Sequence, residues 1–340
     1  MALRDALIAS WYAPRATPLA LALAPLGWVF RALVALRRAL YRSGVLRARR
    51  VRVPVVVVGN ITVGGAGKTP LVAALVRELA ARGRRPGVVS RGYGGAVRGV
   101  REVRPGDAPA LVGDEPLLLA AAGCPVVVGR ERAAAAQALL DAHPGCDVVV
   151  CDDGLQHYAL ARDVEIVAID ARRGLGNGRL LPAGPLREPR SRLDEVDAIV
   201  RLVDGAGDAP RAGTNGRETT MTHVPAGLRN LADPARRVDP SDWRGARVHA
   251  VAGIAHPQRF FDLLARLGVQ AVPHAFGDHH AFTPADLALP GADVIVMTAK
   301  DAVKCAGFAD ERCHALDIRA CLDPALVALV MDRLDGRQAA

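Results

Sequence analysis

Lysine is nearly absent from this sequence. Of its 44 basic residues only Lys68, Lys300 and Lys304 are lysine, and all the others are arginine. A chain with this bias uses arginine wherever either cation serves, so we expect the lysines at positions that need a compact ammonium instead of a planar guanidinium. Lys300 and Lys304 stand close together in the chain, which favours a contact with a nucleotide or a phosphate.

Aromatic residues are also scarce, at 4% of the chain, and no DNA- or RNA-binding motif accompanies the formal net charge of +9. We therefore expect no base-stacking platform and no nucleic-acid partner. The charge favours smaller anionic partners such as nucleotides, phosphorylated substrates and acidic lipids. The six cysteines have no CxxC or Cys/His metal spacing, which indicates reduced thiols instead of a zinc site or a disulfide framework. Nothing in the sequence implies a protein partner.

A long uninterrupted apolar run is missing as well. Residues 17–36 are the most apolar segment, but Pro18, Pro25 and Arg31 interrupt it, which argues against a transmembrane helix. Beyond Pro25 the apolar residues recur at helical spacing, so we predict an amphipathic helix on a membrane surface within residues 1–48. The alternative is a helix packed on the protein's own core. The expected apolar face consists of Leu26, Val29, Phe30, Leu33, Leu36 and Leu40, with Arg31, Arg38 and Arg42 opposite.

A glycine-rich loop follows the apolar strand predicted at 53–58 and precedes a helix that ends near Gly83. A strand, a glycine loop and a helix are the context of a P-loop, whose backbone amides and helix dipole hold phosphate oxygens. Lys68 would reach the β- and γ-phosphates of ATP, and the hydroxyl of Thr69 would bind Mg²⁺. The usual pattern begins with glycine, whereas this loop begins with threonine. The predicted ATP-binding residues are Thr62, Val63, Gly64, Gly65, Ala66, Gly67, Lys68 and Thr69.

An acidic pair, Asp152 and Asp153, follows the strand predicted at 147–151. Carboxylates at the end of a strand resemble a Walker B site, and hard oxygen ligands suit Mg²⁺. The alternative is a solvated turn. Because further strands are predicted at 86–90, 125–128 and 164–169 with helices between several of them, we expect an α/β fold with a mostly parallel sheet covered on both faces.

Several other motifs permit more than one interpretation. Asp114 and Glu115 precede an apolar helix and could simply cap it. The loop that ends in Arg187 and Glu188 could place them near phosphate and metal, or merely connect domains. The segment 276–282 offers histidines for general-base work. The segment 293–304 is not the guanine-specifying NKxD arrangement, which argues against a GTPase.

Taken together, these motifs resemble one family, the tetraacyldisaccharide 4′-kinases. The resemblance rests on GNITVGGAGKTP, SRGYGG, VGDEP, DDGLQH, LPAGPLRE, FGDHHAF and TAKDAVK, which occur in family order across nearly the whole chain. It implies transfer of the ATP γ-phosphoryl group, with Mg²⁺, to the 4′-hydroxyl of a lipid disaccharide at the cytoplasmic face of the bacterial inner membrane. It also implies a P-loop NTPase-like α/β/α domain at 49–185 and a second, smaller α/β/α domain at 186–335 that completes the ATP cleft.

Carried over motif by motif, the resemblance implies that Asp114 is the catalytic carboxylate and His279, in preference to His280, its partner. Asp152, Asp153, Glu188 and Thr69 would lie near Mg²⁺. Arg130, Arg132, Arg187 and Lys300 are candidate contacts for phosphates of the substrate or ATP. The alternative function is a membrane-associated P-loop ATPase switch. Residues 204–245 lack periodicity and are expected to be irregular.

Overall fold

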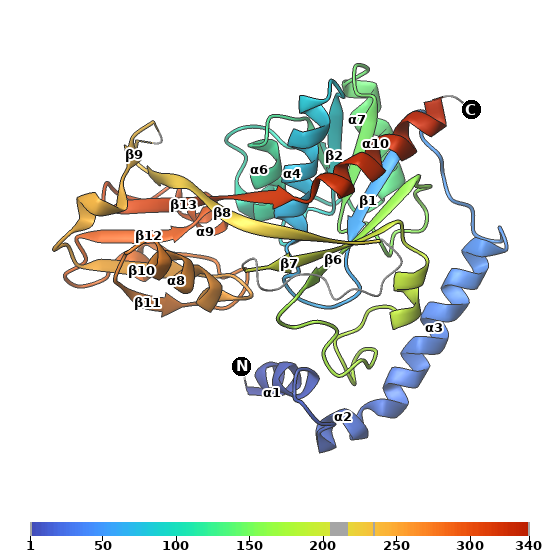
Figure 1. Ribbon diagram of the computed structural model, residues 1–340, viewed down its shortest axis with the longest axis horizontal. Helices are drawn as coiled ribbons and strands as arrows, with labels where there is room; N and C mark the ends of the chain where they lie inside the picture. The colour runs from blue at the N-terminus through green and yellow to red at the C-terminus, as the bar shows by residue number, and fades with distance from the viewer. Residues whose placement is uncertain (1, 205–216, 234, 339–340) are drawn as a thin grey trace.

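The computed structural model describes residues 2–204, 217–233 and 235–338. Its strands form one sheet with the order β11-β10-β12-β13-β8-β7-β6-β1-β5-β2-β4-β3, and β9 pairs with β8 at the side (Figure 1). The strands are β1 (Val55–Gly59), β2 (Pro86–Ser90), β3 (Val100–Glu102), β4 (Val126–Gly129), β5 (Val148–Asp152), β6 (Val164–Asp170), β7 (Ala198–Val203), β8 (Glu218–Asn230), β9 (Arg237–Val238), β10 (Val248–Ala252), β11 (Ala271–Ala275), β12 (Val294–Thr298) and β13 (Cys313–Leu322).

Ten α-helices are described. They are α1 (Ala2–Trp11), α2 (Pro18–Ala22), α3 (Ala24–Arg42), α4 (Lys68–Ala81), α5 (Pro109–Val112), α6 (Asp114–Ala120), α7 (Arg132–Ala142), α8 (Pro257–Arg266), α9 (Ala299–Cys305) and α10 (Pro324–Gln338).

The first half of the sheet holds the P-loop. Strands β7, β6, β1, β5, β2 and β4 run parallel, and their valine-rich sequences are buried, as parallel strands covered on both faces require. Helices α4 and α10 share one core with this sheet, and α7 packs on its other face. The four strands predicted after the first are all present within one or two residues, so the α/β fold is confirmed.

The second half repeats the layered arrangement on a smaller scale. Strands β11, β10, β12 and β13 are parallel. Phe260 and Leu264 of α8 pack in a core on one face, and Ala302 and Cys305 of α9 pack in a separate core on the other. This arrangement confirms the smaller α/β/α layer.

Antiparallel pairing between β8 and β13 joins the two halves into one sheet. The expectation of irregular structure for residues 204–245 is wrong for Glu218–Asn230, which form β8, the longest strand described. Pro225 and Gly227, both unfavourable inside strands, hid this element in the sequence. Because the sheet continues across residue 185, the domain boundaries at 48 and 185 stay a prediction.

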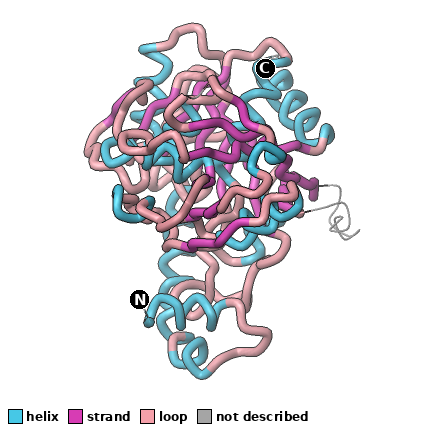
Figure 2. Tube along the Cα trace, turned by 90° about the vertical axis from the view of Figure 1, so that its left-hand side faces the viewer, coloured by secondary structure: helices cyan, strands magenta, loops and turns pink. Residues whose placement is uncertain are grey.

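Helix α3 runs along the outside of the molecule, and α1 and α2 gather at one end (Figures 1 and 2). The inner side of α3 packs against the body of the protein through the buried residues Ala24 and Gly27. Ala183 fills the space beside Gly27. The outer side of α3 leaves Leu26, Val29, Leu33 and Leu36 between 57% and 59% exposed. The alternative of a helix buried in the protein's own core therefore does not hold for this face. Among the described residues, no helix has both the length and the apolarity needed to cross a bilayer.

Candidate active site

The P-loop is fixed by close packing at both of its ends. Gly59 ends β1, and a Cβ there would lie only 2.5 Å from the Cβ of Leu155, so glycine is required. Gly67 precedes α4 with φ +77°, a left-handed conformation that favours glycine. Between them the amide of Val63 donates to the carbonyl of Pro185 at 2.8 Å. Helix α4 begins at Lys68, so the positive end of its dipole points into the loop, as a phosphate site requires.

Asp153 directly follows β5 and pairs with two cations, Lys68 and Arg187. Its carboxylate lies 3.5 Å from Nζ of Lys68 and 3.1 Å from Nη1 of Arg187. Burial alone would raise the pKa of Asp153, but the charges of Lys68 and Arg187 outweigh it and lower the pKa to about 2. The structure therefore brings together three residues that the sequence predicted for phosphate and metal binding.

Asp152 has the environment of a carboxylate that needs a cation. It is buried at the end of β5, where Ser90 donates to Oδ2 at 3.3 Å, and Oδ1 has no hydrogen-bond partner among the described residues. Burial, together with the charges of Glu115 and Asp153, raises its pKa to about 7. A buried carboxylate oxygen left unpaired beside a P-loop suits a hard divalent cation such as Mg²⁺. The unpaired oxygen of Asp152 therefore fits the predicted metal.

Asp114 and His279 meet from opposite halves of the sheet. Asp114 is buried at the first turn of α6, and His279 lies in the loop after β11, with Nδ1 3.1 Å from Oδ2 of Asp114. Burial alone would raise the pKa of Asp114, but the hydrogen bond with His279 and the charge of Lys300 hold it below its ordinary value. The same hydrogen bond raises the pKa of His279. The structure thus forms a carboxylate–imidazole pair from residues 165 positions apart.

His280 belongs to a different environment. Its Nε2 lies 3.2 Å from Asp286, and its ring packs against Phe276 and Phe282. Lys304, the third lysine, contacts the carbonyl oxygen of His280 at 3.1 Å. Of the two adjacent histidines, His279 is therefore the one that contacts Asp114.

Lys300 lies beside this pair. Its Nζ is 3.3 Å from Nε2 of His279, 3.5 Å from Glu115 and 3.4 Å from Asp278. Burial alone would lower its pKa, but the carboxylates of Glu115, Asp114 and Asp278 raise it, so the side chain remains a cation. Lys300 thus has the compact charge that its rarity in this chain led us to expect.

Glu188 and Arg130 are placed differently from the other predicted site residues. Glu188 is buried, and its carboxylate accepts hydrogen bonds from Gln156 at 2.8 Å and Tyr158 at 2.6 Å, with Arg192 at 3.4 Å. Gln156 also donates to the carbonyl of Asn60 at 3.1 Å, which ties Glu188 to the P-loop through protein donors. Arg130 is exposed beyond the end of β4. Neighbouring Arg132 is buried and donates to the carbonyl of Gly129 at 2.6 Å.

The sequence interpretation missed an ionic cluster beside the P-loop. Asp170 ends β6, and its carboxylate pairs with Arg259 of α8 at 3.0 Å. Arg259 also lies 2.7 Å from Asp204, which in turn pairs with Arg172. The rule applied to Asp152, that a carboxylate following a buried apolar strand marks the functional edge of the sheet, would have found Asp170 as well.

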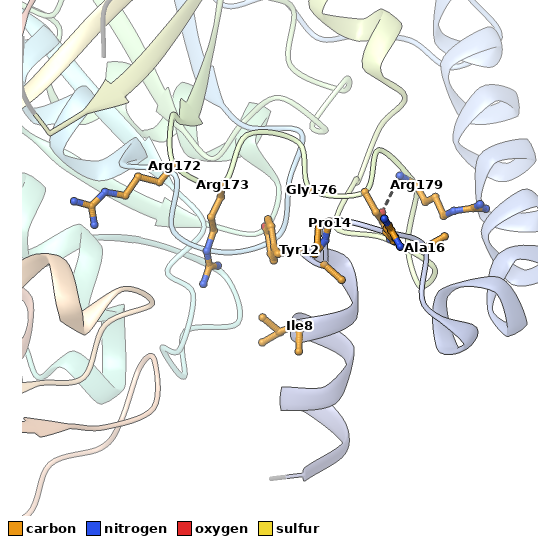
Figure 3. A pocket seen from close by; sticks show the side chains of 12 residues that line it. Ile8, Tyr12, Pro14, Ala16, Arg172, Arg173, Gly176 and Arg179 are labelled. Carbon is orange, nitrogen blue, oxygen red and sulfur yellow. Dashed lines mark hydrogen bonds between the residues drawn. The ribbon is translucent and has the colours of Figure 1, made fainter. Parts of the chain in front are cut away.

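A cavity of about 590 Å³ lies next to this cluster (Figure 3). It is bounded by α1 and the following turn on one side and by the loop after β6 on the other. The basic residues that line it are Arg15, Arg172, Arg173 and Arg179.

A P-loop, a buried acidic residue at the end of the adjacent strand and a carboxylate–imidazole pair together define an ATP-dependent phosphotransferase. Comparison with known proteins agrees with this class. The sequence model of the family described as tetraacyldisaccharide-1-P 4′-kinase, LpxK, matches residues 19–335. The chain therefore belongs to the tetraacyldisaccharide 4′-kinase family.

Named relatives and a solved structure extend the match over nearly the whole chain. The tetraacyldisaccharide 4′-kinase of Azoarcus sp. (strain BH72) is 54% identical, covering 93% of this chain and 92% of the relative. That of Chromobacterium violaceum is 51% identical, covering 95% of this chain and 96% of the relative. The crystal structure of LpxK from Aquifex aeolicus in complex with ATP is similar with a TM-score of 0.79 at 29% identity, covering 93% of this chain and 99% of that one.

Proposed function

We propose that this protein transfers the γ-phosphoryl group of ATP to the 4′-hydroxyl of tetraacyldisaccharide 1-phosphate while it rests on the cytoplasmic face of the bacterial inner membrane. The observation that carries the proposal is the Asp114–His279 pair, formed across the two halves of the sheet on the side of the P-loop. A hydrolytic switch needs only a positioned water. A kinase needs a base that can accept the proton of an alcohol, and Asp114 has the geometry for it.

ATP is held by the backbone amides of residues 62–69 and by the ammonium of Lys68. Thr69 and Asp152 would hold Mg²⁺, which would supply charge neutralisation for the phosphates. The carboxylate of Asp153, paired with Lys68 and Arg187, holds both cations at the phosphate side of the site. These residues align the triphosphate, and alignment with charge neutralisation is most of what phosphoryl transfer requires.

Asp114 accepts the proton of the sugar hydroxyl, and His279 orients the carboxylate and keeps it ionised. The pKa of Asp114 is lowered although the residue is buried, so the base is ready at neutral pH without depending on solvent. The pKa of His279 is raised, because the hydrogen bond with Asp114 favours the protonated imidazole. The imidazole thus stabilises the negative charge of the Asp114 carboxylate. Lys300 balances the acidic cluster around the pair.

The lipid substrate reaches this site from the end of the molecule where α1 and α2 gather (Figure 2). The cavity beside α1, whose lining includes Arg15 and Arg179, has room for a phosphorylated sugar (Figure 3). The exposed apolar face of α3 lies outside the fold, where an interfacial helix would bury it among acyl chains. The acyl chains can thus stay in the membrane while the headgroup meets ATP.

A radiolabel transfer assay tests the function directly. Purified protein is incubated with γ-labelled ATP in the presence and absence of tetraacyldisaccharide 1-phosphate in mixed micelles. We expect label in the lipid fraction and ATP turnover that depends on the lipid. Lys68→Ala should abolish both, and Asp114→Ala should reduce turnover much more than ATP binding. Equal ATP turnover with and without the lipid would indicate a membrane-associated ATPase switch and overturn the proposal.

A further inference from the structure

Arg173 presents its guanidinium to the P-loop. It lies in the loop after β6, and a Cβ at Gly64 would be 3.6 Å from its Nη1. Gly64 belongs to the glycine turn that grips the triphosphate, so phosphates held there are within reach of this side chain. The sequence gives no hint of the contact, because Arg173 and Gly64 are joined only by the folding of β1 against β6.

Arg172 and Arg259, which lie nearby, are already matched by acids, whereas Arg173 is not. Arg172 pairs with Asp204, and Arg259 is held between Asp170 and Asp204. Within the described ranges, Arg173 takes part in no ion pair and instead places its guanidinium 4.7 Å from the ring centre of Tyr12. A cation that is held by an aromatic face retains its capacity for an anion. The charge of Arg173 is therefore not neutralised by a neighbouring acid and is available to bind a phosphate.

The amino-terminal segment holds Arg173 in this position. Trp11 donates from Nε1 to the carbonyl of Pro182 at 2.9 Å, and its own carbonyl accepts from the amide of Asn177 at 2.7 Å. These bonds fix the end of α1 against the loop after β6, and the ring of the next residue, Tyr12, lies beside the side chain of Arg173 (Figure 3). A segment that we place at the membrane thus supports a side chain at the site of phosphate binding.

We propose that Arg173 contacts the phosphoryl group during its transfer, acting as an arginine finger supplied by the same chain, and that Tyr12 is its positioning residue. The proposal rests on the function proposed above. In the transfer, the bond from the γ-phosphorus to the oxygen shared with the β-phosphate breaks, and the bond to the sugar oxygen forms. The hydroxyl proton passes to Asp114 and ADP leaves. The planar guanidinium stabilises the charge that spreads over the transferred oxygens at this stage.

Four variants of the full-length protein test this proposal in mixed micelles with saturating lipid. Arg173→Ala should lower kcat on the order of 10³-fold, with little change in nucleotide affinity or melting temperature. Arg173→Lys should recover only part of the rate, because an ammonium lacks the planar arrangement of N–H donors with which a guanidinium binds two phosphate oxygens at once. Tyr12→Ala should lower kcat by about 10-fold, the scale of a partly desolvated cation–π contact, and Tyr12→Phe should restore it.

Chemical rescue separates a role at the phosphoryl group from a structural one. Free guanidinium should restore part of the activity of Arg173→Ala and none of the activity of Lys68→Ala. Arg82→Ala is the matched control, because Arg82 is exposed at the far end of α4 and pairs with Glu78; it should retain full activity.

Two results would overturn the assignment. One is an Arg173→Ala protein with normal kcat and a raised KM for the lipid, which would place the guanidinium on the substrate's own phosphate. The other is a loss of kcat that guanidinium fails to rescue. Failure of the proposed function would look different, because wild-type protein would then transfer no label to the lipid, whatever residue stands at 173.

Discussion

Burial is the largest single influence on the pKa of Asp114 and raises it, but the hydrogen bond with His279 and the charges of Lys300 and His279 together hold the pKa below its ordinary value. The hydrogen bond with His279 is the largest of the influences that lower this pKa, so its loss should raise the pKa of Asp114 relative to the wild type. Because a general base works only when ionised, the pKa of this carboxyl sets the acid side of the pH–activity profile. In the wild type that side should lie below the ordinary value of 3.8.

We therefore predict that His279→Asn shifts the acid limb of kcat/KM to higher pH, in addition to lowering kcat. The measurement is a pH profile of label transfer at subsaturating lipid. His280→Asn is a matched control, since that imidazole pairs with Asp286 and packs against two phenylalanines. An unshifted acid limb in His279→Asn would show that the imidazole does not control the ionisation of Asp114.

For single residues, the sequence predicted which residue types form the site better than it predicted their contacts. Lys68, Asp153 and Arg187 were each assigned to phosphate or metal, and they meet within 3.5 Å. Arg173 was missed, because an arginine among 41 carries no distinguishing signal in a chain that has three lysines. The charge of a side chain can be read from the sequence, whereas its neutralisation by a distant partner appears only after folding.

Among the elements, α3 is the clearest case of an apolar surface with no protein partner. Its outward side chains recur at the spacing predicted from the sequence and remain more than half exposed. Its other side is tied to the body through Arg38, which pairs with Glu195 and approaches Glu188. A helix that is bound to the protein on one side and exposes apolar side chains on the other suits a position in a membrane interface.

We predict that replacing Leu33 and Leu36 together by glutamate lowers binding to vesicles of acidic phospholipid by roughly 100-fold or more, since each buried leucine contributes about 1.5–3 kcal/mol. Sedimentation of the protein with vesicles measures the change. The control places glutamate at Ala35 and Ala39, which are also exposed but stand outside the apolar positions of the helix. Equal binding by both double variants would contradict a membrane role for this face.

Elements with local signals were predicted well, and those made by distant pairing were not. Strand β1, the loop and α4 are contiguous, so an apolar run, glycines and helical spacing suffice to identify them. Strand β8 depends on β7 on one side and β13 on the other. Its own sequence, interrupted by Pro225 and Gly227, lacks a clean alternation, and so only its partners make it a strand.

Across the whole molecule, catalysis depends on how the two halves of the sheet are held together. Asp114 comes from the first half and His279 from the second, so any opening between them separates the pair. Arg259 forms an ionic link between the halves near the P-loop, because its guanidinium joins α8 to Asp170 and Asp204 at 3.0 and 2.7 Å. Near Arg259, Ala255 packs against Gly65 of the phosphate-binding loop. A Cβ added at Gly65 would lie 3.0 Å from the Cβ of Ala255. The link therefore holds the second half against the phosphate-binding loop.

We predict that Arg259→Met lowers kcat at least about 10-fold while Lys68 still binds ATP. The substitution leaves Asp170 buried without its cation, and removing one partner of a buried pair costs roughly 3–5 kcal/mol, so the halves should separate to let water reach the carboxylates. Stopped assays give kcat, and small-angle scattering gives the radius of gyration, which should increase. Arg312→Met is the control, because Arg312 pairs with Asp310 at the surface of the second half. If Arg259→Met keeps the wild-type kcat, the β8–β13 pairing and the other contacts between the halves hold them in register without this ionic link.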